Sequence, residues 1–131
     1  MGKKIFFQRI DLIPSKWQLD VWVGGKPKKI AKLFHLRYGA SVDYYIENYY
    51  PNRCMTLTST LKSELKGRTQ IVVQLQSFNE DIIVHEVNHA IWHYADNCGL
   101  EMNFDSQEWQ TVLLEYLFNR CKSKSNFTKI N

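Results

Sequence analysis

One long stretch of helical periodicity, between Ser77 and Gly99, constrains the fold more than any other feature of the sequence. Ser77 and Glu80 have the spacing of a capping box, which starts a helix, and Gly99 supplies a residue that readily ends one. One flank of this predicted helix is apolar, through Ile83, Val84, Val87, Ala90, Ile91 and Tyr94. A helix with one apolar flank has to pack against a sheet or another helix.

The remaining segments supply both kinds of partner. Runs of β-branched and aromatic residues predict four strands, over residues 5–13, 17–23, 54–61 and 68–76. A helix is predicted from Pro27 to Gly39, and a C-terminal helix after Asp105. Residues 41–52 are expected to form a loop or a short helical turn. The predicted fold is α+β, with a short, mostly antiparallel sheet packed against the long helix and the C-terminal helix.

Length and composition indicate a single folded unit. The chain has 131 residues, of which 44% are hydrophobic and 23% charged, so it is too short for two ordinary domains and too apolar to be disordered. We assign residues 1–121 to one domain. Residues 122–131 are expected to be a short, basic, polar tail that is frayed.

Several protein classes are excluded by simple patterns. The basic start at Met1 lacks an apolar signal-peptide core, and no run reaches the roughly 20 apolar residues of a membrane-spanning helix. Three cysteines without a Cys-x-x-Cys spacing argue against a disulfide framework and favour a reducing cytoplasm. The net charge of +4 comes largely from lysine-rich runs that lack interleaved aromatic residues or arginines, so no nucleic-acid partner is expected.

The long helix carries the pattern His-Glu-x-x-His, as His85, Glu86 and His89. On a helix, residues four apart differ by about 40° in direction and about 6 Å in height, so both imidazoles can bind one zinc ion. Glu86 projects close enough to the same side to take a proton from a water at the metal. The pattern therefore predicts a Zn²⁺ site with Glu86 as general base.

A hydrolytic zinc site needs a third protein ligand, and Glu108 is the preferred candidate. It follows His89 after 18 residues, the spacing of the gluzincin pattern, and opens the C-terminal helix. A glutamate three residues after Asp105 is also what a capping box requires, so a purely structural role stays open. Glu115, Glu101 and Asp105 are the alternative ligands.

His93 continues the row of His85 and His89, but about 12 Å of helix separates it from His85. It is therefore rejected as a ligand and assigned a supporting, substrate-facing or merely exposed role. Asp96 lies on the same face and could orient a neighbour. His35, in the first predicted helix, is taken as structural.

The order of these segments resembles the small His-Glu-x-x-His metallopeptidases encoded by tailed phages and prophages. The likeness is carried by Arg37-Tyr38-Gly39, by the strand Gln70–Leu75, by the helix from Ile83 to Ala90, and by Gly99 and Glu108 before the run Leu113–Leu117. The resemblance implies a small zincin-like domain of minimal gluzincin type, with His85, His89 and Glu108 as zinc ligands and Glu86 as base. This chain has Val112 where that family often has a tyrosine.

Two functions are expected from these features. The first is a zinc-dependent peptidase in the host cytoplasm, acting on a peptide or protein substrate that pairs with the strand at residues 70–76. The second is a phage structural or assembly protein, with a structural or inactive zinc site, a phage structural partner and a place in the virion. A fourth protein ligand in place of water would favour the second function.

Overall fold

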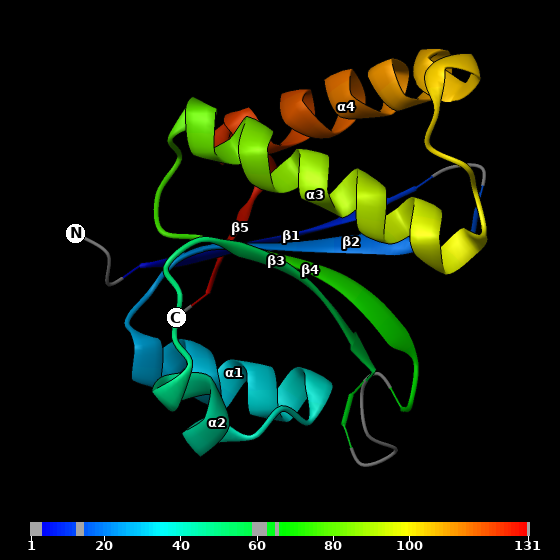
Figure 1. Ribbon diagram of the computed structural model, residues 1–131. Helices are drawn as coiled ribbons and strands as arrows, with labels where there is room; N and C mark the ends of the chain where they lie inside the picture. The colour runs from blue at the N-terminus through cyan, green and yellow to red at the C-terminus, as the bar shows by residue number, and fades with distance from the viewer. Residues whose placement is uncertain (1–3, 13–14, 59–62, 65, 131) are drawn as a thin grey trace.

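The computed structural model describes residues 4–12, 15–58, 63–64 and 66–130. Within these residues a five-stranded sheet forms the middle layer and helices cover both of its faces (Figure 1). The strands are β1 (Ile5–Asp11), β2 (Gln18–Gly24), β3 (Arg53–Thr58), β4 (Thr69–Leu75) and β5 (Thr128–Ile130). The helices are α1 (Pro27–Tyr38), α2 (Val42–Glu47), α3 (Glu80–Cys98) and α4 (Gln107–Lys122), with short 3-10 turns at Phe104–Ser106 and Lys124–Asn126. The α+β prediction is confirmed.

The strand order is β3-β4-β2-β1-β5. Strands β1 and β2 form an antiparallel hairpin, and β3–β4 and β1–β5 are also antiparallel. Only β2 and β4 run parallel among the described strands, with Leu19 opposite Ile71. The sheet is therefore mixed and mostly antiparallel, as expected, while β3 and β5 are its two edges.

Each face of the sheet supports its own apolar core. Helices α3 and α4 cover one face, and α1 and α2 cover the other (Figure 1). The α3 side is built mainly from aliphatic residues, including Leu19, Val21, Ile71, Val73, Val87 and Ile91. The α1 side is aromatic, with Trp22, Phe34, Tyr38 and Tyr45. Alternate residues of β2 and β4 serve opposite cores, as the two-residue period of a strand requires.

Helix α3 starts later than the sequence indicated. The residue that caps it is Asn79, whose side-chain oxygen accepts a hydrogen bond from the Ile82 amide at 3.2 Å. The expected cap at Ser77 is wrong, because Phe78 packs edge-on against Phe6 and Phe127 and belongs to the incoming chain. The end of the helix is as predicted, with Gly99 in the left-handed conformation.

The C-terminal region differs most from expectation. The turn before α4 is capped by Asn103 and Ser106, which bond reciprocally, and not by Asp105. Residues 122–131 are not simply a frayed tail, because Thr128–Ile130 forms β5 and pairs with β1. Phe127 explains the difference: its ring lies 5.1 Å from that of Phe78 and holds the segment against the sheet.

Residues 41–52, expected to form a loop or a short helical turn, contain the short helix α2, capped by Ser41. The predicted strand ends at Ile13 and at residues 59–61 lie outside the described residues. In the part of the chain that is described, no helix has the length and apolar run that a membrane crossing requires.

Candidate metal centre

Helix α3 brings three of the predicted site residues together. His85, Glu86 and His89 each offer a ligand atom, and these atoms all lie within 4.8 Å of one another. Both histidines are exposed, whereas Glu86 is buried, with an exposed fraction of 7%. The grouping follows from helical spacing alone, because His89 lies four residues after His85 and three after Glu86, and residues three or four apart share one side of a helix.

The distance between the two imidazoles fits a shared metal ion. The Nε2 atoms of His85 and His89 lie 3.2 Å apart, and the rings meet edge to face. Two nitrogen ligands at zinc bond lengths and a tetrahedral angle would be about 3.3 Å apart. The two side chains therefore already have the spacing of a zinc-binding pair.

Glu86 lies on the β3 side of the two histidines. Burial and the charge of Glu86 raise the pKa of the Cys54 thiol, in β3, to about 12, which places the carboxylate near that strand. Among the described residues the Glu86 carboxylate has no hydrogen-bond or ion-pair partner. Neither Glu86 oxygen is fully enclosed, so the carboxylate stays accessible to a cation or a water molecule held at the histidines.

The histidines open onto a shallow groove of about 570 Å³ between α3 and α4, lined by Asp81, Val84, His85, Asn88, His89 and Leu114. Val84, expected in the core, is 40% exposed and forms part of the groove wall. Asp81 and Asn88 were missed by sequence reasoning. Their spacing of three or four residues from His85 was the available signal.

Glu108 is not part of this group of ligand atoms, and neither are the alternative ligands Glu115, Glu101 and Asp105. Glu108, Val112 and Glu115 form one exposed stripe of α4, while Leu117 and Cys121 are buried on the other side. Glu101 instead accepts a hydrogen bond from Asn103. The ligand role of Glu108 therefore stays a prediction, one that needs α4 to turn its exposed stripe toward α3.

The other histidines are placed outside the group. His93 faces β3, where its Nδ1 lies 2.7 Å from the Thr56 hydroxyl. Asp96 is exposed, and its charge partly opposes the lowering of the His93 pKa that burial and His89 cause. His35 lies on α1, across the sheet, with its Nδ1 2.9 Å from the Ala40 carbonyl oxygen.

The strand expected to pair with substrate is not available. Strand β4, which contains most of residues 70–76, is hydrogen-bonded to β2 on one side and to β3 on the other. The free edge beside α3 belongs to β3, which carries Cys54 near Glu86 and Thr56 against His93. An extended peptide could add to β3 but not to β4.

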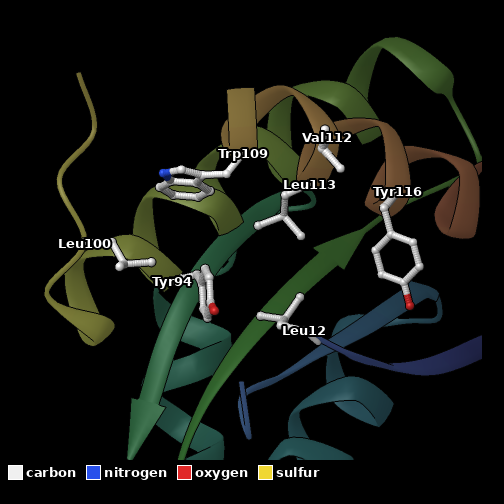
Figure 2. A pocket seen from close by; sticks show the side chains of 7 residues that line it. All are labelled: Leu12, Tyr94, Leu100, Trp109, Val112, Leu113 and Tyr116. Atoms are coloured by element: carbon white, nitrogen blue, oxygen red, sulfur yellow. The ribbon is translucent and has the colours of Figure 1, made fainter. Parts of the chain in front are cut away.

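A separate apolar pocket of about 520 Å³ lies between the C-terminal part of α3, helix α4 and Leu12, the residue that follows β1. Figure 2 shows the side chains that surround it: Leu12, Tyr94, Leu100, Trp109, Val112, Leu113 and Tyr116. None of these residues belongs to the His85, Glu86 and His89 group, and none carries a charge. The pocket therefore lacks the imidazoles, carboxylates and thiols that bind metal ions.

Comparison of the chain with protein-family models, with curated proteins and with solved structures found no match.

Proposed function

We propose that the protein is a zinc-dependent peptidase whose reaction centre is the group His85, Glu86 and His89. The observation that carries the proposal is the 3.2 Å distance between the two Nε2 atoms, with the largely buried Glu86 side chain beside them. Two imidazoles at this distance supply two of the nitrogen ligands that zinc prefers.

His85 and His89 would hold the ion through their Nε2 atoms, and Glu108 is the proposed third ligand. When bound, zinc would lower the pKa of a water molecule and polarise the peptide carbonyl. Asp81 lies eight residues before His89, about 12 Å along the helix, so it cannot share an ion with both histidines. We assign Asp81 instead to the wall of the groove, where it lies beside His85.

Glu86 would move the proton. Its carboxylate accepts a proton from the attacking water, whose oxygen adds to the peptide carbonyl carbon while the carbonyl electron pair moves to the oxygen. Glu86 then gives the proton to the leaving nitrogen as the carbonyl re-forms and the carbon–nitrogen bond breaks, which yields an amine and a carboxylic acid that loses its remaining proton to solvent.

The substrate is proposed to be an extended peptide. The free edge of β3 runs beside the α3 residues of the site, from Cys54 near Glu86 to Thr56 at His93. Backbone pairing with this edge would supply affinity that depends little on the sequence of the peptide. The groove is shallow, so we expect broad sequence specificity.

The test begins with metal binding. Purified protein is expected to bind one zinc per chain, and His85→Ala or His89→Ala is expected to abolish this, because a single imidazole leaves too few ligands. His35→Ala is the matched control, since His35 lies on α1 and should leave the stoichiometry unchanged. Elemental analysis and calorimetric titration measure both. Full zinc binding in both site variants would disprove the metal centre.

Glu86→Gln separates an enzyme from a structural zinc protein. The amide keeps the shape of the side chain but cannot accept a proton, so zinc binding and folding should persist while hydrolysis of a peptide library is lost. If the zinc-loaded wild-type protein cleaves no peptide in a broad library, the structural or assembly function is the better explanation.

A further inference from the structure

His93 links helix α3 to the edge strand β3 in a way that the zinc site does not require. It lies one helical turn after His89, half-buried, with its Nδ1 2.7 Å from Thr56 Oγ1. Asn97, one turn further on, donates from its side-chain nitrogen to the His93 carbonyl oxygen at 2.7 Å and to Thr56 Oγ1 at 3.4 Å. The Thr56 hydroxyl therefore holds the ring, and Asn97 holds that hydroxyl in turn.

The contact with Thr56 bears on which ring nitrogen carries the proton. The amide nitrogen of Asn97 can only donate, so Thr56 Oγ1 accepts from it, and the hydroxyl hydrogen is left free to be donated to His93 Nδ1. Nδ1 is then an acceptor, and the proton of the neutral ring lies on Nε2. Burial, together with the nearby His89, lowers the pKa of His93 below its ordinary value, which favours the neutral ring. In this tautomer His93 offers an Nε2–H group that no described residue uses.

The position of that donor matches the repeat of an extended peptide. His93 follows His89 by four residues, about 6 Å along the helix axis. Carbonyl groups on one side of an extended chain recur every second residue, about 6.6 Å apart. A peptide whose reacting carbonyl lies at the histidine pair therefore brings its next carbonyl of the same orientation to the level of His93.

We propose that His93 is a substrate-anchoring residue, whose Nε2–H donates a hydrogen bond to the peptide carbonyl two residues from the cleaved bond. This inference rests on the proposed peptidase function and narrows its substrate class. The substrates are peptides that extend at least two residues past the cleaved bond toward His93, and shorter ones lose the anchor. His93 holds the peptide and takes no part in the proton transfer.

The first test needs neither metal nor substrate. Nitrogen chemical shifts of the His93 ring in the metal-free protein are expected to show a protonated Nε2 and an unprotonated Nδ1. Thr56→Val keeps the shape of the side chain but removes the hydroxyl, so it should weaken this preference. A wild-type ring protonated mainly on Nδ1 would overturn the proposal, because Nε2 could then donate no hydrogen bond.

The second test compares peptide lengths. The probes are acetylated and amidated peptides that the wild-type protein cleaves, and the same peptides shortened by two residues at either end. His93→Asn keeps a nitrogen near the Nδ1 position but has none at Nε2, so kcat/KM for the full-length peptide should fall about tenfold, the effect of one hydrogen bond. His93→Gln places an amide nitrogen near Nε2 and should retain most of the activity.

Shortening the peptide at one end should lower wild-type kcat/KM by a similar factor, and His93→Asn should then have no further effect. Peptide binding to the zinc-loaded, inactive Glu86→Gln protein should show the same dependence on length and on His93. Equal losses for full-length and shortened peptides in His93→Asn, or no loss for either, would overturn the anchoring role and leave the peptidase proposal standing. A zinc-loaded wild-type protein that cleaves no peptide would overturn both.

Discussion

Asp20 has a charged side chain with an exposed fraction of 0%, and its carboxylate accepts hydrogen bonds from Arg9 and Tyr38. Arg9 binds both carboxylate oxygens, through Nε at 2.7 Å and a terminal nitrogen at 2.8 Å. Tyr38 donates its hydroxyl to the same carboxylate at 2.6 Å and accepts a hydrogen bond from the Trp22 indole. This network lies on the α1 side of the sheet, away from His85, so it serves the fold.

Arg9→Met is expected to destabilise the protein by about 3 kcal/mol, because it leaves the Asp20 charge buried without its partner. Asp20→Asn combined with Arg9→Met should recover part of the loss, since no buried charge then remains. Urea denaturation of the two variants and the wild type measures the difference. A double variant less stable than Arg9→Met would contradict the explanation, and zinc stoichiometry should be the same in all three proteins.

The sequence predicted those site residues that lie close together in the chain. His85, Glu86 and His89 come together because they share one helix, whose geometry is fixed once the helix forms. Glu108 lies on another helix, and its approach depends on how α4 rotates about its axis against α3. An 18-residue spacing does not determine that rotation, and in the structure Leu114, not Glu108, reaches the groove.

Among the elements, α3 positions the candidate site, and both of its ends are well defined. Asn79 caps the start, while Gly99 at the end adopts a φ of 69°. No atom outside the neighbouring residues lies within 4 Å of the position where a Gly99 side chain would begin. Any effect of substitution there must therefore come from the backbone conformation and not from crowding.

Gly99→Ala should cost about 1–2 kcal/mol of unfolding free energy, the price of the left-handed conformation for a residue with a side chain. Gly99→Asn should cost less, because asparagine tolerates that conformation better. Thermal and chemical denaturation compare the two. Equal stability of Gly99→Ala and wild type would show that the helix ends differently in solution.

The sequence predicted well where the first four strands lie in the chain, but it did not predict which strands pair with each other in the sheet. The β-rich runs gave β1, β2, β3 and β4 to within a few residues, because local residue preferences determine where a strand forms. The interior place of β4 depends on pairing with β2, whose partner residues are far away in the sequence. Strand β5 was missed because Thr128–Ile130 is short and largely exposed, and only its pairing with β1 makes it a strand.

Across the whole molecule, both cores contain thiol or tyrosine hydroxyl groups that stay protonated at an alkaline pH at which the unfolded chain would lose those protons. Burial raises the pKa of the Cys54 and Cys121 thiols to about 12 on the α3 side. On the α1 side burial raises the pKa of Tyr38 and of Tyr45 well above its ordinary value. The folded protein therefore binds more protons than the unfolded chain at alkaline pH, and stability falls as the pH rises through that range.

The free energy of unfolding should be nearly constant around neutral pH and should begin to fall at about pH 9, the ordinary pKa of a thiol. In the double variant Cys54→Ala with Cys121→Ala, only the raised pKa of Cys98 still acts from about pH 9, so the fall should be weaker until the tyrosines ionise near pH 10. Urea denaturation between pH 7 and pH 11 gives both curves. A constant free energy up to pH 11 would contradict the burial of these groups.

The parallel pairing of β2 with β4 also sets an order of events for the polypeptide as it folds. Strand β2 meets β1 across a short turn, a local search that takes microseconds in comparable hairpins. Leu19 meets Ile71 only after the intervening chain, with α1, α2 and β3, has closed into a loop. Loop closure of this kind is slow, and α3 can dock only on a sheet that already contains β4. His85 and His89 can therefore come together as soon as helix α3 forms. Glu86 becomes buried only later, when α3 packs against the completed sheet.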